Sequence, residues 1–355
     1  MTSIKPSALL KGEGLPDYDQ ISPKEISENI PILIKDLNEK LKKLEEELAQ
    51  KLSTKNPLSW EHVMPQLYEI GEKLRWSWGV VSHLNAVCNS SELREVYANE
   101  QPKIVRFSNQ LAQNEIIYEA LLNLKEHGII NDATQERIIQ TELITMKNKG
   151  IGLEADKKAL FNSRSERLAE LSTIFSNNVL DATKNWSLLL KNHSEVKGLP
   201  ERTLETLAHA SKEAGDKNEE GNDPTASTGP WRVRLDLPSY IPFQTYAKNR
   251  YLREKVYRAF VSRASEGKLN NKKIIEEILD LRNKQATQLG YKNWCEISLA
   301  TKMADSEEVV ESLLEELRIA AMPHAQEEII QLRDCAKRNG ESDDFELSPW
   351  DISFW

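Results

Sequence analysis

The chain has 355 residues, of which 39% are hydrophobic and 29% charged. This is the composition of a globular protein with room for about two or three domains. The net charge of -9 argues against a nucleic-acid partner, which requires a basic face. No run of about 18 apolar residues is present to span a membrane.

The cysteines and the N-terminus bear on the compartment. Cys88, Cys295 and Cys335 form no CxxC pair and no metal-binding spacing. Their odd number fits reduced thiols rather than a disulfide framework. The first residues, "MTSIKPSALLKGEGLPDYDQ", contain no apolar segment typical of a secretory signal. We therefore expect a cytoplasmic protein.

Residues 1–150 are predicted to form one all-helical domain. Ser22 and Pro23 are typical of a helix start, and Pro31 is expected to kink the helix that follows. The apolar residues of this helix recur at spacings of three and four, as in an amphipathic helix. They are Ile26, Ile30, Leu33, Leu37, Leu41, Leu44, Leu48 and Leu52. Similar patterns predict further helices up to Lys149.

Residues 151–228 are predicted to hold connecting helices and a mobile loop. A long helix is expected from about Glu154 to Leu190, and a shorter one ending at Gly215. The stretch 216–230, "DKNEEGNDPTASTGP", is rich in Gly, Asp, Asn and Pro and has no apolar anchor. It is interpreted as a surface loop or a domain joint. The "KGIG" at 149–152 is too weak to indicate a phosphate loop.

Residues 229–355 are predicted to form a third region. "WRVRLDL" at 231–237 alternates apolar and polar residues, which predicts a strand. Helices are expected again from Asn249. Asp305 and Glu308 form a capping box for the last long helix, which Pro323 should interrupt and Gly340 should end. The fold class is therefore mainly all-α, with a minor strand element near 231–237.

The residues with catalytic potential do not form a recognisable motif. A zinc peptidase helix requires H-E-x-x-H, and the sequence contains none. The nearest pattern is His324 with Glu327 and Glu328, interpreted as a solvated helix face. His83 is expected to be partly buried. The remaining histidines are His62, His127, His193 and His209.

The cysteines and tryptophans do not change this result. None of the three cysteines has a neighbouring histidine in the sequence. Trp60, Trp76, Trp78 and Trp186 are suited to a peptide-binding groove but are more simply explained as core residues. No residue is assigned as catalytic, cofactor-binding or metal-binding.

The final stretch, "SPWDISFW", has the pattern of a helix start. Ser348 is suited to the cap, Pro349 to the first helical position, and Asp351 lies three residues after the cap. A helix of two turns ending in exposed Phe354 and Trp355 would be unstable alone. We therefore expect the sequence to be truncated.

Several stretches in order resemble one family, the thimet oligopeptidase family of zinc peptidases. They are "HLNAVCNSSELREVY" (83–97), "FSNNVLDATKNW" (175–186), "LDLPSYIPFQTYAKNRYLREKVYRAF" (235–260), "LGYKNWCEISLATKMA" (289–304) and "SPWDISFW" (348–355). The resemblance runs from about residue 20 to the end of the sequence and is to the N-terminal half of family members.

The resemblance implies a helical peptidase that cleaves short peptides inside a channel. Its zinc would be held by two histidines and a downstream glutamate, with the motif glutamate as general base. These residues belong to the part of the family beyond the end of this sequence. No catalytic or metal residue is therefore transferred, and we expect no zinc bound to this chain. The implied partners are short peptides and a missing C-terminal catalytic half.

Two functional hypotheses follow, together with a weaker third one. The first is the N-terminal portion of a zinc-dependent oligopeptidase, with residues 229–355 starting the catalytic domain and the chain inactive alone. The alternative is a non-catalytic helical peptide-binding or scaffold protein derived from a peptidase. A coiled-coil adaptor rests only on the apolar seam at 26–52. Sequence following Trp355 with an H-E-x-x-H motif would favour the first hypothesis.

Overall fold

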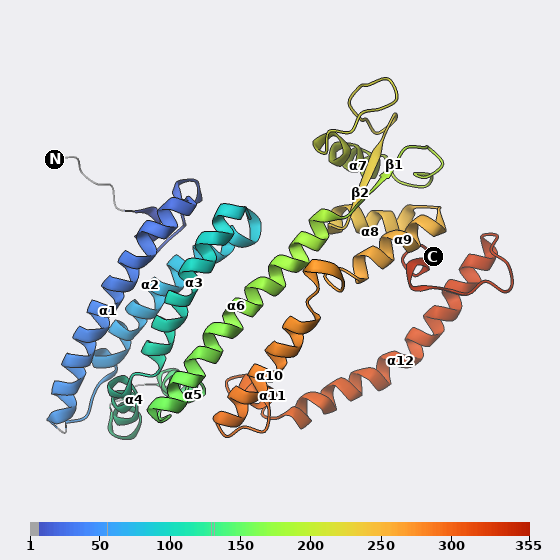
Figure 1. Cartoon of the computed structure of the whole chain (residues 1–355). Coiled ribbons are helices and arrows are strands. Elements are labelled where there is room, and N and C mark those ends of the chain that lie inside the picture. Colours follow the sequence, from blue (N-terminus) through green and yellow to red (C-terminus); the bar gives the residue numbers. More distant parts are fainter. Residues whose placement is uncertain (1–6, 55, 129, 131) are drawn as a thin grey trace, which may run out of the picture. The chain divides into compact units, whose positions relative to one another are not determined.

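The computed structural model describes residues 7–54, 56–128, 130 and 132–355. These residues form twelve α-helices and a two-stranded sheet (Figure 1), which confirms the mainly all-α fold class. The chain divides into two compact units. The first extends to Thr173 and includes Glu277–Glu307, and the second comprises Ile174–Glu276 and Glu308–Trp355. The domain boundaries expected near residues 150 and 228 stay a prediction.

The first unit is built from helices. After two short 3-10 turns, η1 (Ala8–Leu10) and η2 (Tyr18–Gln20), come the five helices α1 to α5. They are α1 (Pro23–Ser53), α2 (Trp60–Val87), α3 (Ser91–Ala112), α4 (Glu115–His127) and α5 (Ala133–Asn148). Part of α6 (Ala155–Asn185), most of α10 (Lys272–Gln288) and α11 (Trp294–Leu299) also belong to this unit.

Helix α1 begins as its sequence predicts. The Ser22 side chain accepts a hydrogen bond from the Glu25 N–H, and Pro23 occupies the first turn. One helix runs through Pro31 from end to end. The proline lies on an exposed position, so its ring needs no space in the core.

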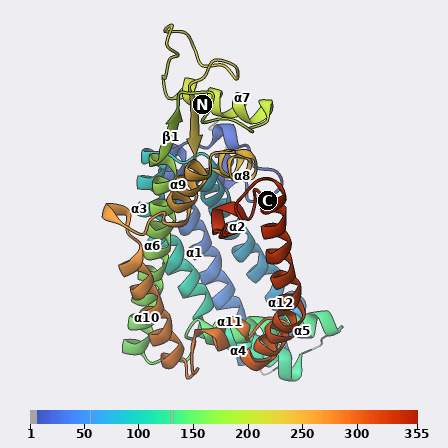
Figure 2. The same ribbon diagram turned by 90° about the vertical axis from the view of Figure 1, so that its right-hand side faces the viewer.

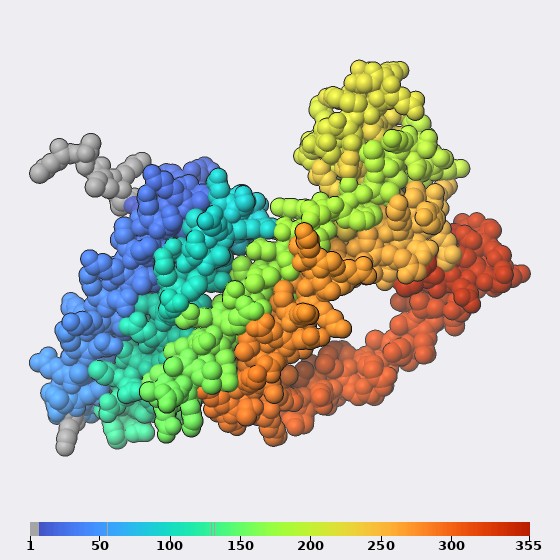
Figure 3. All heavy atoms as spheres, viewed as in Figure 1, coloured from blue at the N-terminus to red at the C-terminus, as the bar shows by residue number. Residues whose placement is uncertain are grey.

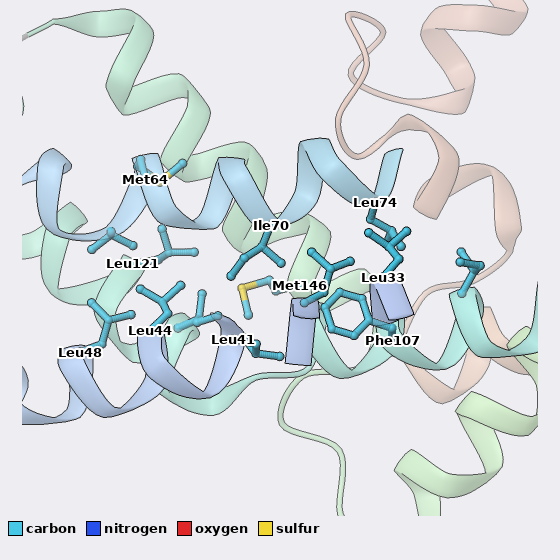
Figure 4. Packing of buried hydrophobic residues seen from close by; sticks show 14 of the residues in the cluster. Leu33, Leu41, Leu44, Leu48, Met64, Ile70, Leu74, Phe107, Leu121 and Met146 are labelled. Atoms are coloured by element: carbon cyan, nitrogen blue, oxygen red, sulfur yellow. The ribbon is translucent and has the colours of Figure 1, made fainter. Parts of the chain in front are cut away.

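The core of the first unit is the predicted α1 stripe together with the helices around it. From Ile26 to Leu48 the stripe residues are at most 1% exposed, so their burial supplies much of this unit's hydrophobic stabilisation. Figure 4 shows side chains from α1 to α5 meeting there. Those labelled are Leu33, Leu41, Leu44, Leu48, Met64, Ile70, Leu74, Phe107, Leu121 and Met146.

The second unit contains the sheet. Strand β2 (Trp231–Arg234) confirms the predicted strand, with Trp231 and Val233 fully buried. Its partner β1 (Ser187–Leu190) is antiparallel and places Leu188 opposite Val233. The prediction of a helix up to Leu190 was therefore wrong, because α6 ends at Asn185. A short apolar run does not separate strand from helix, and only pairing with β2 selects the strand.

The loop 216–230 lies within the second unit, between α7 (Glu201–Glu213) and β2. Asp216 accepts two hydrogen bonds from the Arg232 guanidinium, at 2.9 and 2.8 Å. The Trp231 indole N–H donates to the Ala226 carbonyl at 3.1 Å, and Pro224 is buried. The expectation of a loop without an apolar anchor was wrong. Pro224 within the loop and Trp231 directly after it are both buried and hold the loop in place.

The remaining elements of the second unit are helical. They are α8 (Leu237–Tyr246), α9 (Arg250–Val261), η3 (Gly267–Leu269), α12 (Glu307–Arg338) and η4 (Pro349–Asp351). Helix α12 continues through Pro323, so the predicted interruption there was wrong. Pro323 removes one backbone donor, and hydrogen bonds on either side maintain the helix. None of the helices in the described ranges is long and apolar enough to cross a membrane.

Candidate interaction surface

The two histidines singled out from the sequence, His324 and His83, lie on different helices and are both exposed. His324, with Glu327 and Glu328, is exposed on α12. His83 is exposed on the side of α2 away from the core, with its ring 5.3 Å from that of Tyr18. The expectation of a partly buried His83 was wrong, because its neighbours Val80 and Val81 are buried whereas its own side chain lies on an exposed position of α2.

The other histidines have local partners. His62 completes the cap of α2, where its Nδ1 accepts the Ser59 N–H at 3.1 Å. His193 lies against the edge of Trp231, at 5.1 Å between ring centroids. His127 and His209 are exposed beside Glu126 and Glu213. Each of these contacts explains the histidine without a bound ligand.

The described residues do not fit a zinc centre. Within the parts of the chain that the structure describes, no group of three or more His, Cys, Asp or Glu side chains is arranged to hold a metal ion. Cys88, Cys295 and Cys335 are free cysteines. A zinc peptidase needs three protein ligands and an open position, so no reaction step through a metal can be derived from these residues.

Helix α12 instead presents an unusual surface. Seven of its large apolar side chains are between 45% and 60% exposed, namely Val309 and six residues that follow it along the helix. These six residues, here called the α12 apolar residues, are Leu313, Leu314, Leu317, Ile319, Met322 and Ile330. Figure 3 shows much of α12 as an uncovered row of side chains. Only Ala336 is buried among the 32 residues of this helix.

The α12 apolar residues occupy two sides of the helix. Leu313 and Leu317 are four residues apart and share one side, whereas Ile319 and Ile330 are eleven residues apart and share another. A helix that is apolar on more than one side is ordinarily covered by other protein. Burying a fully exposed Leu or Ile contributes about 1.5–3 kcal/mol. Covering six half-exposed side chains would therefore contribute several kcal/mol.

A buried ion cluster holds the C-terminal segment of the second unit against α9. Asp351 is fully buried and pairs with Arg253 at 2.8 Å and with Arg250 at 2.7 Å. Arg253, 2% exposed, also donates to the carbonyls of Trp350 and Ala247. Figure 2 shows α9 beside the C-terminal turn. The sequence reasoning missed both arginines, because nothing local distinguishes them from exposed helix residues.

The two guanidinium groups of this cluster stabilise the charged form of its single carboxylate. Burial alone would raise the pKa of Asp351. Hydrogen bonds from Arg250, Arg253 and the Ser348 N–H outweigh burial and lower this pKa below its ordinary value. A carboxylate with this many donors stays charged at neutral pH. The cluster therefore acts as a structural anchor.

The predicted cap at Ser348 is present, but the helix is not. Ser348 and Asp351 form a capping box around η4, a single 3-10 turn. Phe354 lies over the Arg253 guanidinium at 3.9 Å, and Trp355 packs edge-on against Phe354. Both aromatic residues are half-buried. The expectation that they would be exposed was wrong, because Arg253 and neighbouring rings cover them.

Two family models match the chain. Residues 30–158 match the model described as Neurolysin/Thimet oligopeptidase, N-terminal domain. Residues 243–355 match the model described as Peptidase family M3. The first range lies in the first unit, and the second includes α9, α12 and the Arg253–Asp351 anchor.

Individual relatives match almost the whole chain. The chain is 38% identical to a probable cytosolic oligopeptidase A of Arabidopsis thaliana, over 99% of this chain and 49% of the relative. It is 37% identical to oligopeptidase A of Haemophilus influenzae, with 98% and 49% covered. For oligopeptidase A of Escherichia coli the identity is 36%, with 96% and 48% covered. The chain thus spans about half the length of the curated relatives it matches.

Proposed function

We propose, from the premise that this chain belongs to peptidase family M3, that it is the N-terminal portion of a zinc-dependent oligopeptidase that hydrolyses short peptides. The observation that carries this proposal is the identity of 36–38% to oligopeptidases A across nearly the whole chain. An unrelated scaffold that shared only one domain would not match over both units.

In this proposal the catalytic centre lies in the half of each relative's chain that the match to this sequence does not cover. The described residues contain no arrangement for a metal, and a zinc peptidase requires one. We expect the 355-residue chain alone to bind no stoichiometric zinc and to cleave no peptide. Its contribution would be structural, as one wall of the peptide-binding channel.

The α12 apolar residues would contact the remaining half of the M3 fold. Two observations support this occupant. The six side chains are about half exposed, and the relatives continue for about as many residues again as this chain provides. Association with that half would remove the apolar surface of α12 from water.

A cytoplasmic location is part of the proposal. It is supported by the name of the Arabidopsis relative, a probable cytosolic oligopeptidase A. Cell fractionation with an antibody against this chain would test it, and recovery in a membrane or organelle fraction would contradict it.

The experiment that tests the function is a chimera. This chain replaces the matching half of Escherichia coli oligopeptidase A, and turnover of a quenched short peptide is measured with and without a chelator. We expect chelator-sensitive cleavage by the chimera, and none by this chain or the other half alone. Metal analysis of each preparation accompanies the assay. Tightly bound zinc at about one ion per isolated chain, or cleavage by that chain, would contradict the proposed division of labour.

The same chimera tests the alternative, a non-catalytic helical peptide-binding or scaffold protein. A chimera that folds, retains zinc and binds the peptide but does not cleave it would favour this alternative. Replacing Leu313 and Leu317 by Glu in the chimera should reduce the yield of assembled protein, since both side chains are proposed to contact the other half.

A further inference from the structure

The first unit contains a partly open cavity of about 220 Å³ between α2, α3, α4 and α5. Its apolar wall consists of side chains from all four helices. These are Met64, Leu67, Leu74, Leu111, Ala112, Ile117 and Met146. The cavity lies inside the segment 30–158 and shares no residue with α12 or with the Arg253–Asp351 anchor.

One carboxylate lines this apolar cavity. Glu142 of α5 is half-buried, and burial raises its pKa above the ordinary value of 4.5. Among the residues that the structure describes, none donates a hydrogen bond to it. Tyr68, also on the cavity wall, has a raised pKa because of its burial and because of the nearby Glu142 charge. A half-buried carboxylate in these surroundings lacks a cationic hydrogen-bond donor.

A positive charge lies at the rim. The Arg75 guanidinium acts on both Glu142 and Tyr68 and lowers the pKa of each, but less than burial raises it. Arg75 is exposed and forms an ion pair with Glu72 of the same helix. The lining of the cavity therefore combines apolar side chains with one carboxylate and one guanidinium, and the guanidinium is exposed.

We propose that this cavity is a binding site for a free apolar α-amino acid of the size of leucine. The ligand's ammonium group donates to Glu142, its side chain lies among the apolar wall residues, and its carboxylate is directed toward Arg75. The volume is below the roughly 300–1,000 Å³ of pockets for drug-sized molecules, which favours a ligand this small. The proposal does not depend on the peptidase function.

A larger side chain in place of Gly71 is expected to fill the cavity and block binding. Gly71 lies in α2 on the cavity wall, and a Cβ added there meets no atom within 4 Å. We expect a leucine at this position to be accepted by the helix, since leucine has a higher helix propensity than glycine, and to occupy the cavity. Gly79, on the same helix, also has open space around its Cβ and is absent from the cavity wall. It is the matched control position.

The test is calorimetric titration of the full chain with L-leucine. We expect saturable binding that weakens at least about tenfold in Glu142→Gln, where the charge-assisted hydrogen bond is lost, and disappears in Gly71→Leu. Glu136→Gln, an exposed carboxylate of α5, and Gly79→Leu should leave the affinity unchanged. N-acetyl-L-leucine, which lacks the ammonium group, should not bind, and L-leucinamide should bind more weakly because it lacks the carboxylate.

Three results would overturn the proposal. They are no saturable heat up to about 10 mM L-leucine, unchanged affinity in both cavity variants, or equal binding of the N-acetylated compound. Circular dichroism of each variant verifies that its helices are formed. Loss of binding in a folded Gly71→Leu chain together with normal binding in Gly79→Leu therefore reports on the cavity itself.

Discussion

Asp351 and Arg253 form an ion pair of 2.8 Å in which both side chains are almost completely buried, at 0% and 2% exposed. The two residues are 98 positions apart in the sequence. Their pairing attaches the C-terminal segment to α9, and Arg250 adds a second guanidinium from the solvent side. The orientation of the last turn depends on this contact rather than on the capping box alone.

Removing one partner of this pair should be costly. Asp351→Ala leaves Arg253 buried without its counter-ion, which destabilises a protein by about 3–5 kcal/mol. We expect faster hydrogen exchange in α9 and in residues 345–355, measured by mass spectrometry, with α1 and α2 unchanged. Asp343→Ala is the control, because this carboxylate is exposed and forms a long ion pair with Lys337, at 3.7 Å. Equal protection of α9 in both variants would show that the pair is not an anchor.

The same carboxylate predicts a dependence on acid. The pKa of Asp351 is lower in the folded protein than its ordinary value of 3.8. Its contribution to the free energy of unfolding is therefore fully present above about pH 4 and is lost as the pH falls through the folded-state pKa. Urea unfolding of the second unit, followed between pH 2.5 and pH 6, should show this loss. The slope should be smaller in Asp351→Ala, and an identical slope would contradict the assignment.

The contribution of Glu142 to the free energy of unfolding should depend on pH in the opposite direction. Burial raises its pKa in the folded state above 4.5, so its contribution favours folding at acid pH and is lost as the pH rises through the raised pKa. Glu142→Gln should stabilise the first unit at pH 7 by a few tenths to about 1 kcal/mol, allowing for solvent screening of a half-buried group. Thermal unfolding at pH 4 and pH 7 tests this. The gain should shrink at pH 4, and a destabilised variant at pH 7 would refute it.

The α12 apolar residues predict how the isolated chain behaves. Leu313→Glu with Leu317→Glu should reduce binding of a hydrophobic dye and any self-association, without lowering the free energy of unfolding by more than about 0.5 kcal/mol. Dye fluorescence and sedimentation velocity give these quantities. Gln326→Glu with Gln331→Glu adds the same charge to exposed α12 positions while keeping the leucines. If that control lowers dye binding equally, charge rather than apolar exposure is responsible.

The stability of the loop 216–230 should depend on Asp216 and only weakly on Asp223, although both carboxylates form ion pairs. Asp216→Asn weakens the partly buried pair with Arg232 and should destabilise the loop by about 1–3 kcal/mol, with faster limited proteolysis between 217 and 229. Asp223→Asn should change the cleavage rate little. Lys212 and Lys217 lower the pKa of Asp223 to about 2, but its carboxylate is exposed and its pairs are screened by solvent.

Periodicity and caps predicted the local structure well. The α1 stripe, the cap at Ser22 and the alternating strand from Trp231 are all present. Two failures have different causes. Ser187–Leu190 is a strand because the distant segment β2 lies beside it. Pro323 does not interrupt α12, because the hydrogen bonds of the same helix on either side of the proline maintain it.

Neither the exposure of the α12 apolar residues nor the cavity lined by Glu142 could be predicted from the sequence. The pattern of α12 indicated a helix but not that its apolar sides would be uncovered, because a pattern does not state what packs against it. Glu142 appeared as an ordinary helix glutamate. Its position on an apolar cavity depends on residues from α2, α3 and α4, which no local window contains.

The sequence by itself determined the helical class, most helix starts, the strand at Trp231 and the resemblance to thimet oligopeptidases, because these follow from short-range periodicity, capping and ordered motifs. Only the tertiary structure decided that β1 is a strand, that Asp351 is buried between Arg250 and Arg253, and that Glu142 faces a cavity. These features depend on the low-dielectric surroundings and hydrogen-bond partners that distant segments provide on folding.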